Sequence, residues 1–160
     1  MGQRLIIEFR SAGKFQVGTY QHWSGYTRSA LETLSKIYSE LCVHNNIISA
    51  LEAIGMREYP DGDRNTGLYT FSEGQFEKDL VPYADMFLTV DLDEMTFDCD
   101  SCFSVHCQDD DEEVDRTNVT VLGCQTIANL EDADLILSEV CAGYDTIFEF
   151  QDSNDAFEEI

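Results

Sequence analysis

The acidic stretch from residue 91 to residue 115 holds the densest set of groups in this chain that could do chemistry. It reads DLDEMTFDCDSCFSVHCQDDDEEVD, with eleven carboxylates and no basic residue before Arg116. Residues 79–160 contain 23 Asp or Glu and one Arg, whereas residues 1–78 contain 9 acids and 8 bases. Summed negative charge repels nucleic acids and anionic membranes and attracts basic surfaces. We therefore expect a basic protein partner, with no direct contact to nucleic acid or membrane. Acidity that only keeps the protein soluble is the open alternative.

The acids of this stretch are the residues expected to meet that partner. Acids on one face of a strand would form an ordered array, and the run after Gln108 would adapt to the partner. The predicted partner-binding residues are Asp91, Asp93, Asp98, Asp100, Asp109, Asp110, Asp111, Glu112, Glu113 and Asp115.

Catalytic chemistry is not indicated by these residue types. Carboxylate pairs can serve as general acid and base, but among 32 acids chance proximity explains any pair. The histidines His22, His44 and His106 have no glycine-flanked nucleophile or phosphate-binding loop beside them. We expect a protein that is not an enzyme and has no catalytic residues.

A cluster of cysteine and histidine lies inside the acidic stretch. Cys99, Cys102, His106 and Cys107 are residue types that zinc prefers. If residues 95–107 form one strand, Cys99 and Cys107 point inwards while Cys102 and His106 point outwards, so the four cannot converge. We expect core cysteines, no metal and no cofactor. The chain starts with no export signal, which favours reduced thiols.

A second candidate site combines aromatic and hydrogen-bonding side chains. His22, Trp23 and Tyr26 could meet Arg64 and Asn65 to line a pocket for a small signalling molecule or nucleotide. The alternative is that the aromatic residues pack at the edge of the core, with their polar tips reaching water.

The first half of the chain predicts a hairpin followed by helices. Residues 4–10 and 15–23 alternate apolar and polar around Ser11-Ala12-Gly13-Lys14. If Phe9 faces Phe15, one buried face is shared by Leu5, Ile7, Phe9, Phe15 and Val17.

A helix capped by Thr27 or Ser29 is expected to follow this hairpin, because apolar residues then recur at helical spacing up to Leu41. A further helix should restart at Asn45 or Asn46 and stop at Gly55. Residues 59–67 predict a loop, with a strand at 68–71 and a short helix near 74–80 after it.

The second half predicts a hairpin that carries the acids. Residues 86–92 and 95–107 alternate with opposite parity, and a two-residue connection at Asp93-Glu94 would pair Leu92 with Met95, Val90 with Phe97 and Leu88 with Cys99. The outer face would then carry Asp91, Asp98 and Asp100. A longer loop of the same parity remains open.

The rest of the second half predicts short elements between acidic segments. Residues 108–118 should form an exposed loop and residues 119–122 a strand. Asn129 and Asp132 resemble a capping box that opens a helix stopping at Gly143. A last strand at 146–150 precedes a frayed acidic tail, 151–160.

These elements predict one α+β domain over residues 1–150, with the acidic half starting at residue 79. Its antiparallel sheet of hairpins would have two to four helices packed mainly on one face. With no apolar run near 18 residues, a cytoplasmic protein is expected.

Three segments also carry a resemblance. Met1-Gly2-Gln3-Arg4-Leu5, His22-Trp23-Ser24-Gly25-Tyr26-Thr27 and Asp63-Arg64-Asn65-Thr66-Gly67-Leu68 resemble small proteins of bacteriophages and prophages of Gram-positive bacteria. The resemblance covers roughly residues 1–105. It implies a phage origin and a location in the host cytoplasm, and it transfers no catalytic residue.

Small acidic phage proteins include anti-CRISPR and anti-restriction inhibitors that present carboxylates in place of DNA phosphates. This chain is similar to them in size and charge. The resulting expectation is a non-enzymatic inhibitor that mimics nucleic acid and blocks the basic channel of a bacterial defence nuclease, such as a CRISPR effector. The alternative is a binding module or sponge for a small signalling molecule.

Overall fold

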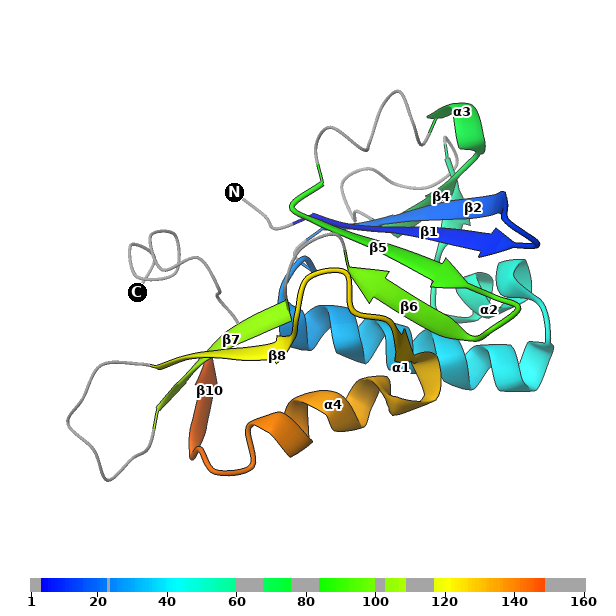
Figure 1. Cartoon of the computed structure of the whole chain (residues 1–160). Helices are drawn as coiled ribbons and strands as arrows, with labels where there is room; N and C mark the ends of the chain where they lie inside the picture. Colours follow the sequence, from blue (N-terminus) through cyan, green and yellow to red (C-terminus); the bar gives the residue numbers. More distant parts are fainter. Residues whose placement is uncertain are drawn as a thin grey trace.

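The computed structural model describes residues 4–22, 24–59, 68–75, 84–99, 103–108 and 117–148, and it has an α+β fold (Figure 1). Two sheets and several helices make up the described part. The elements in chain order are β1 (Leu5–Ser11), β2 (Lys14–Gln21), α1 (Thr27–His44), α2 (Ile47–Ala53), β3 (Arg57–Glu58), β4 (Leu68–Phe71), α3 (Glu73–Gln75), β5 (Met86–Asp91), β6 (Thr96–Cys99), β7 (Phe103–Gln108), β8 (Thr117–Leu122), β9 (Ala128–Asn129), the 3-10 helix η3 (Leu130–Asp132), α4 (Ala133–Val140) and β10 (Thr146–Phe148). Of the predicted loops 59–67 and 108–118, residues 60–67 and 109–116 lie outside the described residues, as does the predicted tail. Gln108 belongs to β7, and Thr117 and Asn118 belong to β8, so the prediction of a loop is wrong at these three positions.

The larger sheet is mixed, so the prediction of a purely antiparallel sheet is wrong. Its strand order is β3-β4-β2-β1-β5-β6-β9. β1 runs antiparallel to β2 but parallel to β5, and β3 runs parallel to β4. Alternation of apolar residues predicts which face a strand buries, but it does not predict which strand lies beside it. The consecutive Leu5, Ile6 and Ile7 are all fully buried, a pattern typical of a central strand covered on both faces.

The β1–β2 hairpin forms as predicted, with a different register. Ala12 and Gly13 both have positive φ, 53° and 73°, as a tight two-residue turn requires. A bulge between Phe9 and Arg10 places Val17 opposite Phe9 and places Phe15 opposite Arg10. Phe15 therefore leaves the predicted inner face and packs on the outer face of the sheet.

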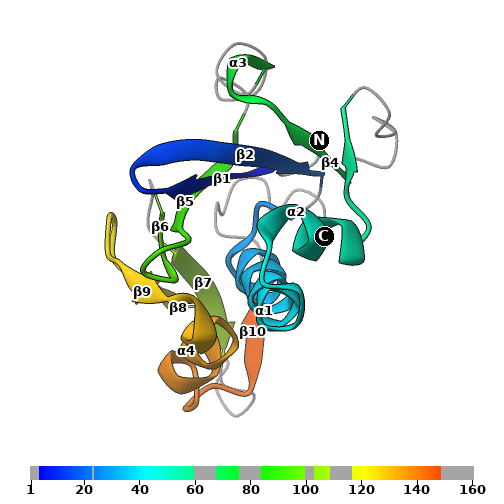
Figure 2. The same ribbon diagram turned by 90° about the vertical axis from the view of Figure 1, so that its right-hand side faces the viewer.

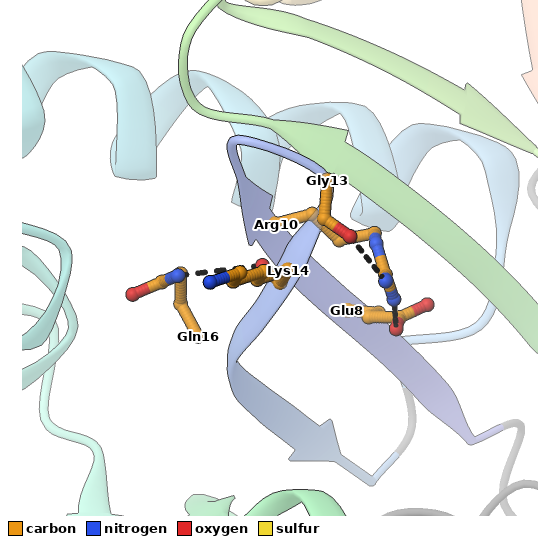
Figure 3. Close-up of polar contacts among 5 residues, drawn as sticks. All are labelled: Glu8, Arg10, Gly13, Lys14 and Gln16. Atoms are coloured by element: carbon orange, nitrogen blue, oxygen red, sulfur yellow. Dashed lines mark hydrogen bonds and ion pairs between the residues drawn. The ribbon is translucent and has the colours of Figure 1, made fainter.

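The hairpin tip is closed by polar contacts that Figure 3 shows. Arg10 forms an ion pair with Glu8 and donates a hydrogen bond from Nη2 to the carbonyl oxygen of Gly13, at 2.8 Å. The Nε2 of Gln16 donates to the carbonyl oxygen of Lys14 at 3.3 Å. Arg10 is thus paired with an acid of its own strand.

Helix α1 does not start with the predicted side-chain cap, because Tyr26 occupies the N-cap position. The Thr27 hydroxyl instead donates to the carbonyl oxygen of Ser104 at 2.8 Å and accepts from its N–H at 3.1 Å, which joins α1 to β7. The restart of α2 is as predicted. Asn46 Oδ1 accepts from the N–H of Ser49, and Gly55 follows the helix with φ 97°.

The β5–β6 hairpin has the predicted pairing within its strands. Val90 lies opposite Phe97 and Leu88 opposite Cys99, but the strands end at Asp91 and Thr96, so the connection is the longer loop of the same parity. The prediction of one strand over 95–107 is wrong. β6 ends at Cys99 in the larger sheet, and β7 belongs to a separate sheet of order β10-β7-β8.

The start of α4 also differs from the predicted capping box. A 3-10 turn, η3, precedes it, and α4 itself runs from Ala133 to Val140, ending before Gly143. Asn129 Nδ2 donates to Asp132 Oδ2 at 3.5 Å in place of the predicted bond to the backbone.

Two apolar clusters hold the elements together. The main core joins the inner face of the larger sheet to α1, α2, α4 and the smaller sheet, and both halves of the chain contribute to it. The second cluster lies on the outer face of the larger sheet and consists of aromatic and aliphatic residues around Tyr20, Tyr69 and Phe71. Figure 2 shows α1 and α2 on one side of the sheet and α3 on the other.

Candidate acidic binding surface

Three acids of the predicted binding stretch lie at the end of β5 and in the loop that follows it, and hydrogen bonds fix two of them. Asp91 Oδ1 accepts hydrogen bonds from the N–H groups of Asp93 and Glu94, at 2.9 and 3.1 Å. Asp side chains commonly close turns by binding backbone two or three residues further on. Asp91 therefore shapes the loop that presents Glu94.

Asp93 ties this loop to the tip of the β1–β2 hairpin. Its Oδ1 accepts from the Ser11 hydroxyl at 2.9 Å, and its Oδ2 accepts from the N–H of Ala12. The hydrogen bond from Ala12, followed by that from Ser11, lowers the pKa of Asp93 below its usual value. The carboxylate therefore remains charged at neutral pH.

A distant segment lies beside the same loop. β9 pairs with β6, and the N–H of Leu130 donates to the carbonyl oxygen of Met95 at 2.9 Å. Together these contacts bring the first turns of η3 and α4, which hold Glu131, Asp132 and Asp134, next to the β5–β6 loop (Figure 1). We define the acidic rim as Asp91, Asp93, Glu94, Glu131 and Asp132.

The sequence-based site omitted Glu94, although it lies in the predicted acidic stretch, and it missed Glu131 and Asp132 of η3 altogether. Acids in the first turn of a helix compensate the partial positive charge of its N-terminus, so their position has a structural explanation of its own. The signal that could have identified them is the pairing of β9 with β6, and a strand of two residues is too short to recognise from sequence.

Charge is divided unevenly over the described residues. Those between 84 and 148 include ten carboxylates and no Lys or Arg, whereas those between 4 and 75 include six carboxylates and six Lys or Arg. The ion pairs Arg10–Glu8 and His44–Glu40 both lie in the second of these groups. The acidic rim thus belongs to a part of the described chain that contributes no strong cation.

A cleft of about 440 Å³ opens beside the rim. The last turns of α1, the β5–β6 loop and the β9–η3 segment line it with Tyr38, Leu41, Cys42, Asn45, Leu92, Glu94, Met95, Asn129 and Glu131. The neighbouring Cys42 side chain raises the pKa of the Tyr38 phenol above its ordinary value, and burial and Glu131 add to this. Tyr38 therefore stays protonated and able to donate.

The remaining predicted acids have different outcomes. Asp98 lies on β6, half-buried on the outer face together with Asp91, as predicted. The other predicted acids, Asp100, Asp109, Asp110, Asp111, Glu112, Glu113 and Asp115, lie outside the described residues.

The alternative ligand pocket receives little support from its described members. Tyr26, the N-cap residue of α1, is buried. The Nδ1 of His22 lies 2.6 Å from the Tyr20 hydroxyl. Trp23, Arg64 and Asn65 lie outside the described residues. Neither His22 nor Tyr26 lines the cleft beside the acidic rim. Neither of them lines a second cleft, of about 580 Å³, to which α2, β2, β3 and β4 contribute.

The cysteines are separated by the break after β6. Cys99 is buried in the larger sheet, whereas Cys107 lies on β7 with its sulfur 3.6 Å from that of Cys141. His106, predicted to point outwards, is buried. The expectation of reduced thiols holds for Cys42, Cys99, Cys107 and Cys141 and is wrong for Cys124, which is disulfide-bonded.

Within the described ranges, no three His, Cys, Asp or Glu side chains come together in a way that could hold a metal ion. Nor does any helix in the described part of the chain have the length and apolar character needed to cross a membrane.

Comparison of the chain with protein-family models, with curated proteins and with solved structures finds no match. A functional proposal for this chain therefore depends on its own residues and geometry.

Proposed function

We propose that this chain is a non-enzymatic protein that binds the basic, nucleic-acid-binding surface of a partner and blocks it. The proposed partner is a bacterial defence nuclease, with a CRISPR effector as the leading candidate, and the proposed origin of the chain is a phage. The observation that carries this proposal is the ratio of ten carboxylates to no Lys or Arg among the described residues between 84 and 148.

Fixed carboxylates support this function better than mobile ones would. A nucleic-acid channel binds its substrate largely by neutralising phosphates, so a competitor must present negative charge in a stable arrangement. Asp91 and Asp93 are held by hydrogen bonds to backbone and to the neighbouring hairpin. Ordering these side chains before binding reduces the entropy lost on association.

Direct competition with DNA provides the test. Purified guide-loaded effector nucleases are titrated with the chain while binding of a labelled target DNA is followed by fluorescence polarisation. We expect displacement of DNA that weakens steeply between roughly 50 and 200 mM salt, because screening weakens contacts between exposed charges.

One control tests whether the chain and DNA occupy the same channel. Raising the concentration of the labelled DNA should overcome the inhibition if the two compete. The proposal would be contradicted if the chain bound the nuclease without changing the affinity of the nuclease for DNA. Inhibition that does not depend on salt would also contradict it.

A further inference from the structure

The cleft beside the acidic rim has a mixed lining that suits one kind of occupant. Leu41, Leu92 and Met95 supply apolar surface, and each is half-buried. Glu94 and Glu131, both exposed, supply carboxylates from two segments that are far apart in sequence. The space is therefore apolar along its wall and negative at its mouth.

Among the residues that the structure describes, no cation lines this cleft. The nine lining residues include no Lys, Arg or His. The cleft also lies at the C-terminal end of α1, where the last peptide carbonyls carry partial negative charge. Asn45, which ends this helix, and Asn129 add amide oxygens that can accept hydrogen bonds.

The second cleft of the described chain shows a different charge pattern. It is larger, about 580 Å³, and has its own apolar residues, but Arg57 lies in its lining beside Glu52 and Glu58. Carboxylates without a cation among the described lining residues thus distinguish the cleft at the acidic rim from this larger cleft.

We propose that the cleft at the acidic rim is an anchor site for an arginine side chain of a basic polypeptide partner. The methylene stem would lie along Leu92 and Met95, and the guanidinium group would reach Glu94 and Glu131. This inference rests on the proposed function, which it deepens by naming the group that the acidic surface recognises.

Arginine fits this cleft better than lysine for geometric reasons. A guanidinium group has five donors in a planar fork and can bind two carboxylates at once, whereas an ammonium group acts as a point charge. The ring of Tyr38 adds an aromatic wall, and guanidinium groups stack on such rings. A volume of about 440 Å³ is near the lower end of ligand sites, which suits one side chain.

The test uses N-acetyl-argininamide as the probe and follows the Met95 methyl group by NMR. N-acetyl-citrullinamide has nearly the same shape without charge, and N-acetyl-lysinamide has the charge without the fork. We expect saturable shifts at Met95 with the arginine probe, at least threefold weaker binding of the lysine probe, and no saturation with the citrulline probe.

Variants of the chain locate the effect. Glu94→Gln/Glu131→Gln should weaken binding of the arginine probe at least tenfold. Glu32→Gln/Glu139→Gln removes two exposed acids away from the cleft and should leave binding within about twofold, because exposed charges at a distance are screened. The melting temperature of each variant shows that the fold is kept.

Two results would overturn the anchor site. One is equal binding of the arginine and citrulline probes, and the other is equal weakening by the two double variants. If the cleft variant fails to bind the probe but still displaces DNA from the nuclease, the anchor is not used by that partner while the proposed function stands. If the probe binds and no nuclease is inhibited, the cleft stands and the proposed function fails.

Discussion

The described residues between 4 and 75 and those between 84 and 148 differ in charge but share one core. The first group balances six acids with six bases, and the second has ten acids and no Lys or Arg. Both nevertheless bury side chains in the same main cluster, for example Leu5 and Phe9 from the first and Leu88 and Phe97 from the second. The described residues of the acidic half therefore belong to this core and do not form a separate tail. Alternating strands keep their apolar face intact while the other face carries charge.

Truncating a side chain of the shared core should have the largest effect on the stability of the fold. Phe97 is 1% exposed and packs edge-on against Phe103. Phe97→Ala should destabilise the fold by about 3–5 kcal/mol, through lost burial and the cavity left behind. Denaturant unfolding followed by Tyr fluorescence and by circular dichroism should show one coincident transition.

The control for this variant is Leu135→Ala, since Leu135 lies on α4 and is 50% exposed. It should change stability by less than about 0.5–1 kcal/mol. Two separate transitions in the Phe97 variant would show that the two regions unfold independently.

Neutralising the acids of the second half should affect partner binding more than stability. Replacing Asp109, Asp110, Asp111, Glu112 and Glu113 by Asn or Gln should weaken binding to the target nuclease by about 2 kcal/mol, roughly thirtyfold, mainly through a slower association rate. Stopped-flow association at low salt measures this. The melting temperature should stay the same or rise, because like charges repel. Unchanged association would remove these acids from the interface.

The cysteines of the smaller sheet give a third prediction. Burial, together with the Cys141 thiol at 3.6 Å, raises the pKa of Cys107 to about 12. At pH 8 iodoacetamide should label the exposed Cys42 and leave Cys107 unmodified in the native protein, as mass spectrometry can show. Labelling of Cys107 at the rate of Cys42 would contradict the burial.

The same shift has a consequence for stability. The Cys107 thiol ionises more readily in the unfolded chain than in the folded one. Its contribution to the free energy of unfolding is therefore complete below the unfolded pKa of about 9 and is lost as the pH rises towards 12. Cys107→Ala should cost about 1 kcal/mol at neutral pH and should flatten the alkaline part of the stability profile.

The smallest effect is expected at the contact between the two regions. Asp93 has a lowered pKa because its carboxylate accepts hydrogen bonds from Ala12 and Ser11. The stabilisation that these bonds give the fold is therefore present above the pKa of Asp93 in the unfolded chain, 3.8, and is lost as the pH falls through its pKa in the folded chain. Asp93→Asn should lower the melting temperature slightly at pH 6 and leave it unchanged at pH 2. A matched loss for Ser11→Ala would support the contact, and an unchanged melting temperature at pH 6 would exclude it.

Local pattern predicted much of this fold. The two hairpins, helices α1 and α2 and the pairing of Val90 with Phe97 follow from alternation, helical spacing and turn residues. The register error at Phe15 arose because a bulge adds one residue without any sequence signal. The parallel neighbour of β1 and the break after Cys99 depend on contacts between distant segments, which periodicity does not encode.

The candidate site was predictable only in part for the same reason. Asp91 and Asp98 were placed on the outer face by strand parity, and the structure agrees. Asp93 is held by hydrogen bonds to Ser11 and Ala12 at the tip of the first hairpin. Ala12 lies 81 residues before Asp93 in the sequence, so local pattern could not predict this contact. Glu131 joins the rim through a strand of two residues.

The parallel pairing of β1 with β5 has a consequence for the order of folding. Leu5 lies opposite Met86, so one edge of the most apolar strand has no neighbour until the acidic half has been synthesised. Contacts this distant in sequence slow folding, and an open apolar strand edge is prone to pair with other chains in the meantime. The negative charge that arrives with β5 would then also keep nascent chains apart at the stage when this edge is being covered.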